Sequence, residues 1–225
     1  RSCVGVAGAV RLLEFGLGNL GGLRCCEIGV RKPQIVNLGV LPGGTASYAR
    51  AISSDGSTVV GVISIGSGAF RWTRANGMQD LGAPVGSLGA NAWAVSADGQ
   101  VVGGMSYYWG STAGQTVTTP CVWIGTGAPQ ELVAHGYQSQ NLVTGVSGDG
   151  SMLVGSSSYN YNHALTIYSP WRWSVGGGFL RIDHLANDGY GGVVNDISAD
   201  ASAMSGWFSD RSGDIRAVRW NAEVV

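Results

Sequence analysis

One short pattern occurs four times in this chain, and it restricts the possible folds more than any other feature of the sequence. Each copy holds an aspartate at a turn, then an apolar run, then a tryptophan; an aliphatic residue closes the first three copies, and a further one precedes the first copy. The turn aspartates are Asp55, Asp98, Asp149 and Asp200; the tryptophans are Trp72, Trp123, Trp173 and Trp220; the aliphatic residues are Leu38, Leu81, Leu132 and Ile182. The pattern returns every 43 to 51 residues, the range in which each repeat is one four-stranded propeller blade.

The spacing within the pattern separates fixed segments from a variable one. Each of the first three tryptophans precedes the next aliphatic residue by 9 positions, and each aliphatic residue precedes the next aspartate by 17 or 18. The interval from aspartate to tryptophan, in contrast, varies from 17 to 25 positions. Surface loops tolerate such insertions because they bury little of the core. We therefore expect the variable interval to carry the loop face of the domain.

The residues around each aspartate indicate a tight hairpin between two strands. Asp-Gly pairs at 55–56, 98–99 and 149–150 suit such turns because both residues tolerate a positive φ. The fourth copy has Ala201 after Asp200, so its turn is expected to be strained or of another type. One acid per copy at a tight turn is more simply explained by turn chemistry than by calcium binding or a pair of catalytic carboxylates. One tryptophan per copy, at a fixed register, indicates packing between neighbouring blades.

These features predict an all-β domain over residues 35–225, a β-propeller of four-stranded blades with four repeats. The repeats are expected at about 45–82, 88–133, 139–183 and from about 191 to 220. Residues 35–39 have the pattern of a fourth strand that lacks the other three strands of its blade.

Pairing of residues 35–39 with the last blade would close the ring, and the alternative is that the chain belongs to a longer array. Closure is favoured because exposed edge strands promote aggregation. Residues 1–34 lie outside the repeat and are expected to be a poorly ordered extension.

The first copy also resembles a known repeat family. Ser-Ser-Asp-Gly-Ser-Thr-Val-Val-Gly at 53–61, Ala-Phe-Arg-Trp-Thr at 69–73 and Gly-Met-Gln-Asp-Leu-Gly at 77–82 resemble the bacterial extracellular HAF repeat. The other copies match it more loosely, and the resemblance covers about 35–225. It implies a secreted or surface-exposed protein, in some cases an autotransporter passenger, with a propeller fold and no established catalytic residues. The expected location is therefore extracellular or at the bacterial cell surface.

Composition excludes several classes of partner. The net charge is −1 at pH 7 and charged residues make up only 12% of the chain, so no strong field attracts nucleic acid or anionic lipid. No apolar run approaches the ~20 residues that a membrane helix requires. We therefore expect no nucleic-acid partner and no membrane insertion by this segment.

The sequence contains no catalytic or metal-binding motif, so neither a cofactor nor a metal is predicted. His135, His163 and His184 lie 28 and 21 residues apart and lack the spacing of metal ligands. Cys3 could form a disulfide with Cys25 or Cys26 in an oxidising compartment, and the sequence leaves that pairing open.

The longest insertions, at 105–119 and 156–169, fall between the second and third strands of their copies. In a propeller these loops emerge on the same side as the connections between blades, opposite the Asp-Gly turns. Exposed aromatic rings among Asn, Ser and Gly are typical of adaptable recognition surfaces. The candidate ligand-binding residues on this side are Tyr107, Tyr108, Trp109, Tyr159, Tyr161, His163 and Trp207. The competing interpretation is that these rings only cover the cores of their own loops.

These observations predict a secreted or cell-surface recognition module that binds a glycan or an extracellular protein. The first alternative is an extracellular propeller hydrolase or lyase, whose candidate residues are Asp188, Asp210, Asp214 and His184. All four fall in one part of the chain, whereas catalytic sets on propellers usually draw on several blades, so an enzyme is not the favoured interpretation. The second alternative is a purely structural passenger or spacer.

Overall fold

The structure, a computed structural model, describes residues 34–64, 68–110, 114–132, 139–161, 165–182, 189–210 and 212–221. The chain divides into two units, residues 1–36 and 37–225, and the elements below belong to the second. The extension expected at 1–34 lies outside the described residues except for its last position. None of the described residues belongs to a helix that could span a membrane.

The described residues form fifteen β-strands and no helix, which confirms the predicted all-β class. The first meander holds β1 (Ser47–Ile52), β2 (Thr58–Ile63), β3 (Gly68–Thr73) and β4 (Gly77–Asp80). The second holds β5 (Gly89–Val95), β6 (Val101–Trp109), β7 (Thr116–Ile124) and β8 (Gln130–Glu131). The third holds β9 (Ser139–Val146), β10 (Met152–Tyr161), β11 (Leu165–Ser174) and β12 (Gly178–Arg181). The fourth holds β13 (Gly189–Ile197), β14 (Ala203–Asp210) and β15 (Ile215–Asn221).

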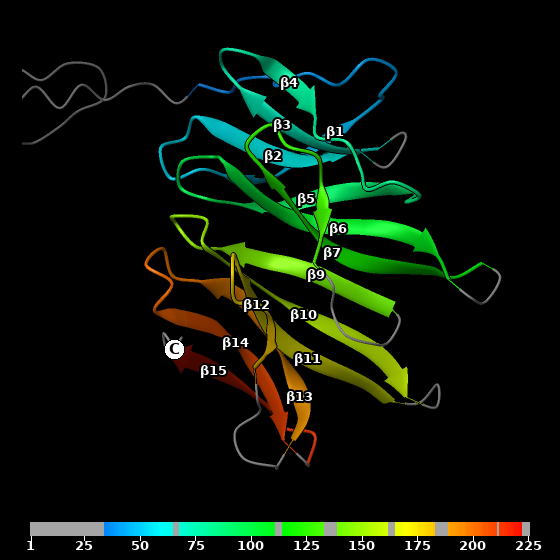
Figure 1. Cartoon of the computed structure of the whole chain (residues 1–225), viewed down its shortest axis with the longest axis vertical. Coiled ribbons are helices and arrows are strands. Elements are labelled where there is room, and N and C mark those ends of the chain that lie inside the picture. Colours follow the sequence, from blue (N-terminus) through cyan, green and yellow to red (C-terminus); the bar gives the residue numbers. More distant parts are fainter. Residues whose placement is uncertain are drawn as a thin grey trace, which may run out of the picture. The chain divides into compact units, whose positions relative to one another are not determined.

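Within each meander, consecutive strands pair antiparallel, so neighbours in sequence are neighbours in the sheet. A parallel bridge between Tyr168 and Gly191 joins β11 to β13, and the third and fourth meanders therefore share one seven-stranded sheet. Figure 1 shows the meanders one beside the next, from β1–β4 at the top to β13–β15 at the bottom. Their first strands form a common edge, because β1 contacts β5, β5 contacts β9, and β9 contacts β13.

The two ends of the meanders differ in kind. β6 and β10 run from the tight turns at the left of Figure 1 towards the right, where they end at Trp109 and Tyr161. We call the end with the aspartate turns the turn end. The opposite end, with Ile63, Leu88, Trp109 and Thr116, is called the loop end. The tight turns and the insertions thus lie at opposite ends, as the sequence predicted.

Apolar clusters join each meander to the next. The first contains Val60, Ala69, Ala90, Ala92, Val102, Cys121 and Trp123; the second contains Val122, Leu132, Val143, Leu153 and Trp171; the third contains Val154, Val194, Ile197 and Met204. Among the repeated tryptophans, Trp123 is fully buried, while Trp72, Trp173 and Trp220 are partly buried against apolar clusters. Burial of each large side chain contributes about 1.5–3 kcal/mol, so these clusters are the main force between meanders.

Residues 35–39 do not form the strand that the sequence predicted. Residues 34–40 contain no strand, and β15 pairs only with β14 in the described part of the chain. The expected closure of a ring through 35–39 is therefore wrong. The physical reason is that none of the described strands accepts the backbone hydrogen bonds of these residues. Leu38 instead packs against the cluster of Val59, Ile63 and Phe70 on the first meander.

Each aspartate turn is held by the same Ser-x-Asp network. Ser53 Oγ donates to Asp55 Oδ1 at 2.6 Å and accepts from the Thr58 amide at 2.9 Å. Asp55 Oδ1 also accepts from the Ser57 amide at 2.9 Å. The same serine-to-aspartate bond, at 2.6–2.7 Å, joins Ser96 to Asp98, Ser147 to Asp149 and Ser198 to Asp200.

These hydrogen bonds stabilise the ionised carboxylates. The serine hydroxyl, followed by the backbone amide two residues after each aspartate, lowers the pKa of all four side chains below the ordinary value. The pKa of Asp200 falls to about 2. Each aspartate thus closes a turn, and this is what the sequence predicted.

The fourth turn keeps the geometry of the others despite its different residue. Gly56, Gly99 and Gly150 have φ values of 72°, 72° and 71°, and Ala201 has a φ of 57°. Ala201 is the one non-glycine residue with a positive φ among those described. A side chain in this left-handed region costs roughly 1–2 kcal/mol. The expected strain at Ala201 is therefore confirmed.

A β-bulge interrupts the first strand of every meander at the same place. Opposite each bulge, the second strand carries a glycine six residues after the turn aspartate. The unpaired bulge residues are Arg50, Trp93, Thr144 and Asn195, and the facing glycines are Gly61, Gly104, Gly155 and Gly206. A Cβ on any of these glycines would overlap a carbonyl oxygen of the first strand and meet an aromatic ring. Only glycine fits this contact.

Ala201→Gly is expected to raise the free energy of unfolding by about 0.5–1 kcal/mol, because glycine relieves the left-handed strain while adding some unfolded-state entropy. Chemical denaturation measures the change. Gly56→Ala is the matched control: an added Cβ there has open space around it and suffers only from the φ of 72°, so a loss of about 1 kcal/mol is expected. A neutral or destabilising Ala201→Gly would contradict the shared turn geometry.

Candidate functional site

An open cleft of about 240 Å³ lies at the loop end, between the first two meanders. Its lining comes from β2, β5, β6, β7 and the residue that precedes β5. The lining residues are Val62, Ile63, Leu88, Asn91, Tyr107 and Thr116. Three aliphatic side chains and a few polar groups form a surface that can take an apolar group and fix its orientation. Tyr107, a residue predicted from the sequence, belongs to this cleft.

The polar groups of the cleft are only partly satisfied. Asn91 Nδ2 donates a hydrogen bond to the hydroxyl oxygen of Tyr107. Asn91 Oδ1 is buried and has no hydrogen-bond partner among the described residues. Burial raises the pKa of Tyr107, although the hydrogen bond from Asn91 and the charge of Arg50 act in the opposite direction. A buried acceptor without a donor is costly, so Asn91 Oδ1 is an unfavourable feature of the interior beside the cleft.

Two bulge residues meet near this cleft. The guanidinium carbon of Arg50, on β1, lies 4.4 Å from the centroid of the Trp93 ring on β5. Arg50 is exposed and Trp93 is half-buried. A cation over a tryptophan face is stabilised by the ring quadrupole, so the contact fixes the guanidinium on the common edge of first strands. Sequence reasoning missed both residues.

Tyr108 and Trp109, the two predicted residues after Tyr107, have different surroundings. The Tyr108 hydroxyl donates to Glu131, which also accepts from Ser106 Oγ at 3.0 Å. Burial, with the hydrogen bond to Glu131, raises the pKa of Tyr108 to about 12. Tyr108 is thus engaged within its own sheet. Trp109, at the end of β6, is 69% exposed.

The remaining predicted residues are spread over the third and fourth meanders. Trp207 packs edge-on against Tyr168, with ring centroids 5.2 Å apart, and this contact joins β14 to β11. Tyr159 and Tyr161 lie at the end of β10, and their side chains are not among those described. His163 lies outside the described residues. Of the predicted residues, Tyr107 therefore lines the cleft, whereas Trp207 packs against another residue of the fold.

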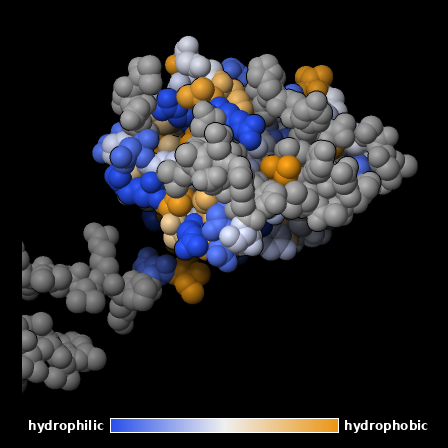
Figure 2. All heavy atoms as spheres, turned by 90° about the horizontal axis from the view of Figure 1, so that it is seen from below, coloured by the Kyte–Doolittle hydropathy of each residue, from blue (hydrophilic) through white to orange (hydrophobic). Residues whose placement is uncertain are grey.

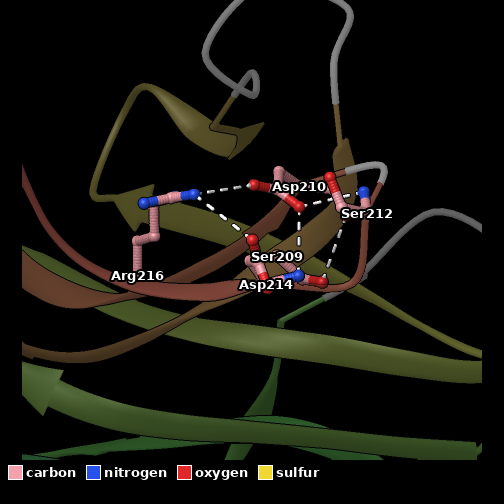
Figure 3. Close-up of polar contacts among 5 residues, drawn as sticks. All are labelled: Ser209, Asp210, Ser212, Asp214 and Arg216. Carbon is pink, nitrogen blue, oxygen red and sulfur yellow. Dashed lines mark hydrogen bonds and ion pairs between the residues drawn. The ribbon is translucent and has the colours of Figure 1, made fainter.

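Two of the acidic residues considered for catalysis, Asp210 and Asp214, are joined by a hydrogen bond and by a shared ion-pair partner. Asp210 Oδ1 accepts from the amides of Ser212 and Asp214 at 2.9 and 3.0 Å. Arg216 lies between the two carboxylates, 3.3 Å from Asp210 and 3.4 Å from Asp214 (Figure 3). Desolvation acts to raise the pKa of Asp210, but the amide of Asp214 and the guanidinium of Arg216 outweigh it and the pKa is lowered. Both carboxylates are thus used to hold the turn between β14 and β15.

Asp188 and His184, the other two residues of that hypothesis, lie outside the described residues. Within the described ranges, no group of three or more His, Cys, Asp or Glu side chains could hold a metal ion. Cys121 is a buried free thiol, and burial raises its pKa.

Figure 2 shows the fourth-meander side of the molecule, where hydrophilic and hydrophobic side chains alternate over the coloured residues. The loop-end cleft is therefore the stronger candidate site.

Comparison with known proteins identifies a shared fold. The chain matches no family model and no curated protein. A solved structure named "putative TolB", from Agrobacterium tumefaciens, is 15% identical with a TM-score of 0.50, and the match covers 79% of this chain and 58% of that one. TolB from Acinetobacter baumannii is 12% identical with a TM-score of 0.52, over 78% of this chain and 41% of that one.

The chain thus spans about half the length of these two proteins. At such low identity the likeness concerns the fold alone. Both contain a β-propeller, and the described part of this chain has a propeller-like arrangement of antiparallel sheets.

The two tryptophans among the predicted residues, Trp109 and Trp207, are expected to respond differently to truncation. Trp109→Ala should change the free energy of unfolding by less than about 0.5 kcal/mol, because the ring is mostly in solvent. Trp207→Ala should lower it by about 2 kcal/mol, because the ring packs on Tyr168 across two meanders. Denaturant titration of both variants measures this. Equal losses would show that Trp109 also covers a core.

Proposed function

We propose that this chain is a recognition module that binds a glycan or a protein partner at the loop end. The observation that carries the proposal is the cleft between the first two meanders, where the aliphatic side chains of Val62, Ile63 and Leu88 lie beside the hydrogen-bonded pair of Asn91 and Tyr107. Such a combination is typical of binding sites. Trp109, exposed at the same end, adds an aromatic anchor of the kind that dominates binding energy.

The location that we propose is extracellular or the bacterial cell surface. Its support is the resemblance of 53–61, 69–73 and 77–82 to the HAF repeat, together with the recurrence of the same turn network in four meanders. We further infer that each meander is one blade of a β-propeller, a proposal supported by the TolB-like fold and by the stacking of first strands along one edge.

The test is a binding screen of the purified chain against immobilised glycans and extracellular matrix proteins. Tyr107→Ala and Trp109→Ala are each expected to weaken binding of the strongest hit about tenfold or more, because aromatic anchors contribute 1.4 kcal/mol or more. Val175→Ala is the matched control: this side chain is 67% exposed but lies at the turn end. Absence of any ligand, or equal effects of all three substitutions, would contradict the proposal and favour a structural spacer.

A further inference from the structure

Arg50 carries a charge that the described part of the chain does not neutralise. Its guanidinium rests on Trp93 at 4.4 Å, and no described carboxylate forms an ion pair with it. The carboxylates of Asp210 and Asp214 in the fourth meander are, in contrast, paired with Arg216. The charge of Arg50 therefore remains available to a ligand.

The contact of Arg50 with Trp93 also restricts the position of its hydrogen-bond donors. The ring covers one side of the guanidinium, so its N–H groups are accessible from the sides away from the ring. Those N–H groups match the two oxygens of a carboxylate. Trp93 holds this cation in place, because it projects from the equivalent bulge of the next meander. The pair is thus arranged to receive a carboxylate.

The neighbouring cleft favours a peptide over a sugar. Its walls include Val62, Ile63 and Leu88, which can bury an aliphatic or aromatic side chain but cannot hydrogen-bond sugar hydroxyls. The ring of Trp93 is covered on one face by Arg50, so that face is not open for stacking a sugar ring.

We propose that the loop-end cleft and Arg50 together bind an acidic peptide. An apolar side chain would enter between Val62, Ile63 and Leu88, and a nearby carboxylate would bind the guanidinium of Arg50. This inference rests on the proposed recognition function and specifies its ligand. Trp93, which carries Arg50, lies on β5 two residues after the lining residue Asn91, so the cation and the cleft lie along the same strand.

The test begins with random heptapeptides displayed on phage and selected on the immobilised full chain. Enriched peptides are expected to carry Asp or Glu within one or two positions of an aliphatic or aromatic residue. The best peptide is then synthesised with a fluorescent label, once with its acid and once with the corresponding amide. Fluorescence anisotropy with the unaltered chain and with Arg50→Gln gives a double-mutant cycle.

Arg50→Gln is expected to weaken the acidic peptide about tenfold and to leave the amide peptide unchanged, because both changes remove the same ion pair. Arg50→Lys should restore part of the loss, since it keeps the charge without the planar fork. Arg74→Gln is the matched control, because Arg74 is an exposed arginine between β3 and β4 at the turn end and its loss changes net charge equally. Denaturant titration of each variant verifies that folding is retained.

The outcomes separate this inference from the function on which it rests. Binding that is lost in Tyr107→Ala but unaffected by Arg50→Gln would overturn the acidic-peptide proposal and leave the recognition function standing. Enrichment of neutral peptides, absence of enriched peptides, or binding confined to glycans would also overturn it. Binding that neither substitution alters would contradict both proposals.

Discussion

The contact between a bulged first strand and a glycine on the second strand is the constraint on which this structure depends. In all four meanders the bulge brings a carbonyl oxygen and an aromatic ring so close to the glycine that a Cβ would overlap them. The ring is Phe70, Trp123, Trp171 or Trp220. A bulge increases the local twist of its strand, and the ring above the glycine belongs to the apolar contacts of that meander. The same contact of bulge, glycine and ring thus sets the local twist in each meander.

The same bulges supply chemical variety along the common edge of first strands. The Ser-x-Asp turn network is the same in all four meanders, but the unpaired bulge residues are an arginine, a tryptophan, a threonine and an asparagine. A bulge turns its extra residue away from the normal alternation of the strand, a device that is common beside binding sites. Arg50 and Trp93 meet because both occupy this position in neighbouring meanders. The turns and the bulge–glycine contacts are therefore repeated in every meander, whereas the bulge residues along the common edge of first strands differ from one meander to the next.

Sequence reasoning predicted the elements that depend on local chemistry. The aspartate turns follow from residue preferences within six positions, and the strain at Ala201 follows from one missing glycine. Residues 35–39 were predicted wrongly because a strand also needs a hydrogen-bonding partner, which the repeat spacing does not reveal. Tyr107 was identified, but Arg50 and Trp93 were not. A bulge adds no distinctive residue to its own strand, and its only sequence signal is the facing glycine on the next one.

The free energy of unfolding of Gly155→Ala tests the central claim most directly. An added Cβ would overlap the carbonyl oxygen of Leu142 and the ring of Trp171, so the account predicts a loss of about 3 kcal/mol. Gly110→Ala is the control, because an added Cβ there has its nearest neighbour at 3.3 Å. Equal stability of the two variants would show that bulge, glycine and ring are not in contact, and the frame described for this chain would be wrong.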